Sequence, residues 1–158
     1  MAVANTSPIF SLTGLIQRSS IVSGITALAT SNGTAATGIS GTSGEMIVVA
    51  TGDATNGSYL QRIRFRWTGS TSTSAATSPV VRLYVSTVSS GATTSSNTYC
   101  IEEIVMGVQT AASATVATFP YDVALNFILP AGSFLLASVS AKPTANTEIC
   151  MTVYGGNY

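Results

Sequence analysis

The chain has 158 residues, of which 8% are charged, and its six basic and six acidic residues give a formal net charge of zero. An average soluble domain carries about 25% charged residues, and non-specific nucleic-acid binding needs a basic excess that this chain lacks. The absence of histidine excludes Ser-His-Asp and Cys-His catalysis and imidazole metal ligation. So few charges favour self-association, because little repulsion keeps copies apart.

Residues 1–22 are predicted to be an extended N-terminal arm or a first strand, since β-branched residues such as Ile16 and Ile21 suit an extended segment. No secretory signal is recognisable, and no segment approaches the ~20 apolar residues that span a bilayer. We therefore expect a protein made in the cytoplasm, with no membrane partner. Residues 23–158 are predicted to form one β-sandwich domain, with a polar loop over 30–45.

A short apolar strand is predicted over 45–50, followed by a turn over 52–58. The pair Asn56-Gly57 in this turn is a strong hairpin signal, because both residue types tolerate positive φ.

Residues 59–67 carry the clearest pattern in the chain, because apolar and basic side chains alternate there. The two sets are Ile63, Phe65 and Trp67, and Arg62, Arg64 and Arg66. A strand has a period of two, so we expect the apolar set in a core and the arginines on the opposite face. A register slip of one residue would bury three guanidinium groups, so the register should be firmly set.

The later strands are predicted over 80–88, 99–108, 123–129, 134–140 and 149–153. Residues 129–132 form a turn between two of them, with Pro130 presetting φ and Gly132 free to adopt positive φ. No amphipathic helix is predicted. This pattern predicts an all-β fold, an antiparallel β-sandwich that is jelly-roll-like, with an extended N-terminal arm.

The acidic residues and cysteines do not form a pattern typical of catalysis or metal binding. Glu102 and Glu103 are neighbours on a strand and point to opposite faces, so we expect one of them to pair with an arginine across the sheet. Residues 53–57 lack the carboxylates of a calcium loop. Cys100 and Cys150 are expected to be buried free thiols. We predict no enzymatic activity, no cofactor and no metal site.

The arginine set is the one concentrated candidate site, comprising Arg62, Arg64 and Arg66. It is either an exposed strand face paired with Glu or covered by loops, or a contact surface for another subunit, an acidic protein or phosphate. Nucleic acid is disfavoured as a partner, because there is no second basic cluster and no matching set of exposed aromatic residues.

Taken together, the order of several short motifs resembles small virion proteins of tailed bacteriophages, of the capsid decoration or cement type. The resemblance spans about residues 56–158. Its motifs are Asn56-Gly57-Ser58 leading into Tyr59-Leu60-Gln61-Arg62-Ile63-Arg64, then Val81-Arg82-Leu83-Tyr84-Val85, Glu102-Glu103-Ile104, Leu129-Pro130-Ala131-Gly132 and the final Gly155-Gly156-Asn157-Tyr158. Related sequences tend to end in Gly-Gly-Asp and an aromatic residue, whereas this chain has Asn157 at the position of the acid.

This resemblance implies a non-enzymatic structural protein, often a homotrimer, that binds and stabilises an assembled phage capsid shell. Its partners would be the phage major capsid protein and other copies of itself. It would be made in the host cytoplasm and reside on the capsid surface of the virion. The alternative is a phage tail or host-attachment β-module that binds a receptor or carbohydrate. Loops composed mainly of Ser, Thr, Ala and Gly make carbohydrate binding the weaker hypothesis, because it usually relies on exposed aromatic and acidic side chains.

Overall fold

The computed structural model describes residues 13–22, 46–69, 79–89, 93–94, 96–107, 120–141, 143 and 147–158. Within these ranges the chain forms strands and no helix, which confirms the predicted all-β class. The strands are β1 (Thr13–Val22), β2 (Ile47–Thr51), β3 (Ser58–Gly69), β4 (Val80–Ser86), β5 (Thr98–Val105), β6 (Tyr121–Leu129), β7 (Phe134–Val139) and β8 (Thr147–Asn157). The predicted arm before residue 13 and the predicted loop over 30–45 lie outside the described residues.

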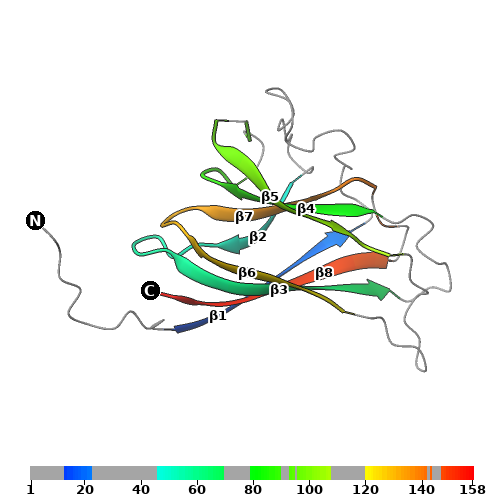
Figure 1. Ribbon diagram of the computed structural model, residues 1–158, viewed down its shortest axis with the longest axis horizontal. Coiled ribbons are helices and arrows are strands. Elements are labelled where there is room, and N and C mark those ends of the chain that lie inside the picture. Colours follow the sequence, from blue (N-terminus) through cyan, green and yellow to red (C-terminus); the bar gives the residue numbers. More distant parts are fainter. Residues whose placement is uncertain are drawn as a thin grey trace, which may run out of the picture.

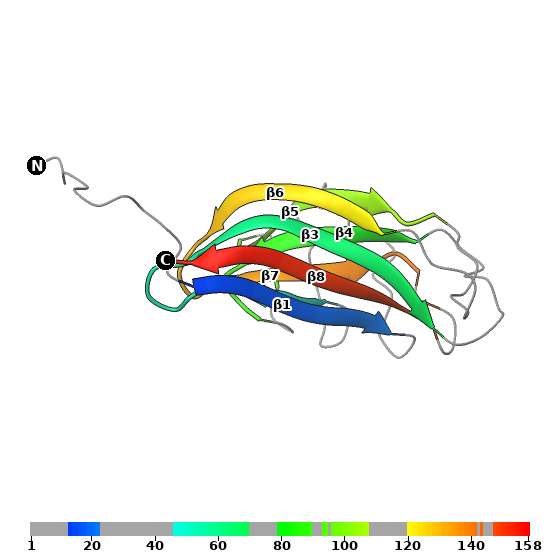
Figure 2. The ribbon, with the colours of Figure 1, turned by 90° about the horizontal axis from the view of Figure 1, so that it is seen from below.

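The strands form two four-stranded sheets, with the orders β1-β8-β3-β6 and β2-β7-β4-β5. Every pairing within them is antiparallel. The two sheets lie face to face as two layers (Figure 1), so the predicted antiparallel β-sandwich is confirmed. Figure 2 shows the first sheet in front of the second, with β8 and β3 in its middle and β1 and β6 at its edges.

The core lies between the layers and includes the apolar set of β3. The exposed fractions of Ile63, Phe65 and Trp67 are 0%, 0% and 5%, which confirms the predicted register of this strand. Burial of such side chains contributes roughly 1.5–3 kcal/mol each to folding. The alternation predicted for β6 is also confirmed, because Val123, Leu125 and other odd-numbered residues of β6 pack against this core.

The middle strands of the second sheet, β4 and β7, are buried on both faces. Val81, Leu83 and Val85 of β4 belong to the core between the sheets, as predicted. On the opposite face Tyr84 is completely buried, where it packs with Met46 and Leu136 and shares a hydrogen bond with Ser138 at 3.1 Å. The outward face of the first sheet is therefore the more accessible of the two outer faces.

The turn over 52–58 forms as predicted, but it does not close a hairpin. The Asp53 carboxylate accepts hydrogen bonds from the backbone N–H groups of Thr55 and Asn56, both at 2.9 Å, and Gly57 has a φ of 80°. However, β2 pairs with β7 in the second sheet, whereas β3 pairs with β6 and β8 in the first. The hairpin prediction is thus wrong, because the turn carries the chain from one layer to the other.

A β-bulge interrupts the alternation of β3 near its beginning. The register against β8 shifts between Leu60 and Arg62, so Gln61 is an extra residue on β3. As a result Leu60 and Ile63, three positions apart, are both completely buried. The strands β3 and β8 approach so closely here that a Cβ on Gly155 of β8 would lie only 2.0 Å from the carbonyl oxygen of Tyr59.

Candidate functional site

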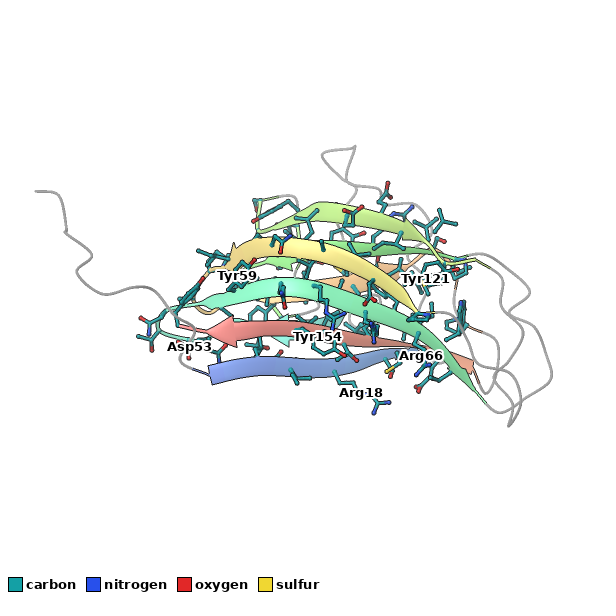
Figure 3. The ribbon with its side chains drawn as sticks, turned by 60° about the horizontal axis from the view of Figure 1, so that its bottom comes forward. Arg18, Asp53, Tyr59, Arg66, Tyr121 and Tyr154 are labelled. Carbon is teal, nitrogen blue, oxygen red and sulfur yellow. The ribbon has the colours of Figure 1, made fainter. Side chains whose placement is uncertain are left out.

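The three arginines predicted as the site lie on the outward face of the first sheet, which we call the arginine face. It comprises Arg62, Arg64 and Arg66 of β3 together with Arg18 of β1, and β8 lies between these two strands. Figure 3 shows Arg66 and Tyr154 on this face, with Arg18 at the β1 edge. Four of the six basic residues of the chain therefore share one surface.

One cross-strand row contains the centre of this face. Its members, in order from β1 across β8 and β3 to β6, are Arg18, Thr152, Arg64 and Asp122. Side chains opposite each other on one face of a sheet are close enough to interact. The row alternates basic, hydroxyl, basic and acidic groups across all four strands.

Arg64 uses its guanidinium fork on Asp122. Its Nε and Nη2 donate hydrogen bonds to the two carboxylate oxygens at 2.8 and 2.7 Å, and Arg62 Nη1 lies 3.5 Å from Oδ1. The pKa of the Asp122 carboxyl is lowered, first by the hydrogen bond from Arg64 and then by the positive charges of Arg64 and Arg62. The pair is more than a third exposed, so it orients Arg64 toward β6 more than it stabilises the fold.

Arg62 is also engaged within the molecule. Its guanidinium carbon lies 4.3 Å from the centre of the Tyr154 ring, a cation–π geometry. Arg62 and Arg64 are thus paired with an acid across the sheet, but that acid is Asp122 and not the glutamate that was expected.

Arg18 and Arg66 are exposed and differ from this pair. Arg66 makes no ion pair or side-chain hydrogen bond with any described residue. Arg18 donates from Nε to the sulfur of Cys150 at 3.2 Å, and this hydrogen bond is the largest cause that raises the pKa of Arg18. The terminal guanidinium nitrogens of both side chains remain available to donate to an anion.

A groove of about 330 Å³ lies between these arginines, along β8. Alternate residues of β8 form its floor, while β1 and β3 supply its sides. The lining residues are Arg18, Arg64, Arg66, Thr68, Cys150, Thr152 and Tyr154. Guanidinium groups and hydroxyls around an open depression form a site suited to oxyanions such as carboxylate or phosphate.

Sequence reasoning identified the β3 arginines but missed Arg18 and the floor of the groove. Arg18 is 132 residues from its contact Cys150, and only the pairing of β1 with β8 brings them together. The alternation of Met151 and Val153 with Thr152 and Tyr154 was a usable signal, because it separates a buried from an outward set on β8.

The glutamates and cysteines have local structural roles. Arg82 Nε donates to Glu103 Oε1 at 2.6 Å on β4 and β5, which confirms the predicted cross-sheet pair. Glu102 faces the other way, opposite Leu83. Both thiols are free, as predicted, but only Cys150 is buried; Cys100 is half-buried on β5, and burial raises the pKa of its thiol.

Two other kinds of feature are absent from the described residues, a metal centre and a membrane-spanning helix. In these ranges no three or more Cys, Asp or Glu side chains are grouped so as to hold a metal ion. The described part of the chain also contains no helix long and apolar enough to cross a membrane. Comparison with family models, with curated proteins and with solved structures finds no match to this chain in any of the three.

Proposed function

We propose that this protein is a non-enzymatic structural virion protein that binds and stabilises an assembled phage capsid shell. The arginine face is the observation that carries the proposal. It concentrates four of the six basic residues on the accessible face of a rigid sheet, whereas the rest of the chain has few charges. A surface of this kind suits charge-assisted hydrogen bonds to carboxylates of a neighbouring protein. The motif order described above supplies the identity of that neighbour, the major capsid protein.

The pairing of the strands supports a finer description of the fold. The pairs β1–β8, β2–β7, β3–β6 and β4–β5 are nested along the chain, each outer pair enclosing the next. Alternate pairs fall in alternate sheets. Eight strands in two sheets with this nesting favour a jelly roll, an architecture found in viral capsid proteins.

A homo-oligomer, with a trimer as the specific proposal, is part of the same function. Ile16 and Ile128 are 72% and 57% exposed on the two edge strands of the arginine-face sheet. Apolar side chains at the edges of a weakly charged protein favour contacts with further copies. Light scattering should give about three times the chain mass of 16.1 kDa. A mass equal to one chain over a wide concentration range would contradict the oligomer.

Capsid binding is tested by co-sedimentation with empty capsids assembled from the major capsid proteins of tailed bacteriophages. The wild type should sediment with the capsids and saturate. A variant with Arg62→Ala and Arg66→Ala removes two positive charges but leaves the two hydrogen bonds of Arg64 to Asp122 in place, so it should fold and sediment weakly. Thermal melts of both proteins control for folding. If the wild type stays in the supernatant while it binds host cells, it is a host-attachment module and the capsid proposal is wrong.

A further inference from the structure

The arginines that line the groove are not equivalent, and the difference identifies which of them can meet a ligand. Arg64 donates two of its hydrogen bonds to Asp122, on the side away from β8. Arg66 has no partner among the described residues, and Arg18 is held only through its Nε. Available donors therefore stand on both sides of β8, one set from β1 and one from β3.

The floor between them offers one polar group unused by the described residues, the hydroxyl of Thr152. Thr152 is opposite Arg18 on one side and Arg64 on the other, and Cys150 is opposite Arg66. The Thr152 hydroxyl makes no hydrogen bond within the described part of the chain. It can therefore donate to the same anion that the two arginines approach from above.

The shape of the groove favours an extended peptide over a small ion. From Cys150 to Tyr154 its floor follows five residues of one strand, which corresponds to roughly 13 Å between the first and last Cα atoms. An inorganic oxyanion would occupy a small part of that length. An extended segment in the strand direction would fill it and place alternate side chains over the floor.

The charges around the groove disfavour a polyanion. Glu148 lies at one end, where it accepts a hydrogen bond from Thr68 at 2.8 Å, and Asp122 lies on the β6 side. A ligand with continuous negative charge, such as nucleic acid, would meet both carboxylates. A peptide that places one or two carboxylates between Arg18 and Arg66 would avoid them.

We propose that this groove binds an extended acidic segment of a partner protein, with a carboxylate held between Arg18, Arg66 and the Thr152 hydroxyl. The inference rests on the proposed function, because it names the contact through which a capsid protein would be recognised. Arg64 is not a direct contact to the ligand in this proposal, since its guanidinium group already donates two hydrogen bonds to Asp122.

The probe is an acidic hexapeptide, acetylated and amidated at its ends, with two glutamates at alternate positions among serines and alanines; it is titrated into the full chain at low salt and followed by calorimetry. Binding is expected in the micromolar to millimolar range. Arg18→Ala and Arg66→Ala should each weaken it about tenfold, the loss of one charge-assisted contact. Arg62→Ala is the matched control, because it removes the same charge from the same face but lies outside the groove lining, so it should weaken binding less than about threefold.

Three results would overturn the inference. The first is absence of acidic-hexapeptide binding to a folded wild type. The second is an equal loss in the Arg62 variant, which would indicate attraction by overall charge. The third is inorganic phosphate binding as tightly as the peptide and depending on the same arginines, which would make the groove a small-oxyanion site.

Capsid co-sedimentation of the same variants separates this inference from the proposed function. Capsid binding that survives in both Arg18→Ala and Arg66→Ala overturns the groove as the contact but leaves the capsid function standing. A wild type that binds the acidic hexapeptide in the groove but not capsids supports an acidic-peptide site and overturns the capsid function. Thermal melts should show little change in either variant, since both side chains are exposed.

Discussion

Replacement of Trp67 tests the register of β3 and, with it, the side of the sheet on which the arginines lie. The indole is 5% exposed, packs in the core between the sheets, and donates from Nε1 to the carbonyl oxygen of Gly107 at 3.3 Å. Trp67→Ala should cost about 3–5 kcal/mol, because it leaves a cavity as well as losing apolar burial. Trp67→Phe keeps most of the ring but loses the hydrogen bond, and should cost about 1–2 kcal/mol.

Thermal unfolding gives these costs a measurable size. For a domain of this length, 1 kcal/mol shifts the melting temperature by about 2–4 °C, so Trp67→Ala should lower it by roughly 6–20 °C. Trp67 is the only tryptophan, so unfolding of the variants must be followed by far-UV circular dichroism rather than tryptophan fluorescence. All proteins should be compared at one concentration, because the stability of an oligomer depends on it. A melting temperature within about 2 °C of wild type for Trp67→Ala would place the indole at the surface and refute the assigned register.

Three further predictions concern the sheet and its charges. Gly155→Ala should cost about 3 kcal/mol or more in urea unfolding, because its Cβ would lie 2.0 Å from a backbone oxygen of β3, whereas Gly14→Ala meets nothing within 4 Å and should be tolerated. Glu103→Ala should lower the free energy of unfolding by about 1–3 kcal/mol, because it removes this partner from the nearly buried Arg82. The control Glu102→Ala changes an exposed neighbour and should stay within about 0.5 kcal/mol of wild type. Equal losses in the two variants would contradict the pairing. The pKa of Asp122 is lowered in the folded protein, so its carboxylate stabilises the fold above the unfolded pKa of about 3.9. This stabilisation is lost as the pH falls through the folded pKa, and the urea midpoint of the wild type should fall with it. In Asp122→Asn the urea midpoint should therefore fall less below about pH 4 than in the wild type.

The faces of the strands were predictable because side-chain alternation is a local property of an extended chain. The contrast between Arg64 and its neighbours Ile63 and Phe65 already indicated which side is buried, and the structure agrees. The turn chemistry of residues 52–58 was local in the same sense, so Gly57 has its positive φ as expected. The fold class and the three β3 arginines of the candidate site could therefore be predicted from the sequence.

The sequence alone thus determined which residues alternate and where the chain turns, whereas strand pairing was decided only in the tertiary structure. A turn reverses the chain but does not select the strand that accepts its hydrogen bonds, so the hairpin expected at Asn56-Gly57 became a crossing between sheets. The β-bulge at Gln61 lies where β3 and Gly155 of β8 approach closely. The groove forms because β8 lies between Arg18 and Arg66. These contacts join positions about 85 to 135 residues apart, and such pairings follow from burying one shared core rather than from any local pattern.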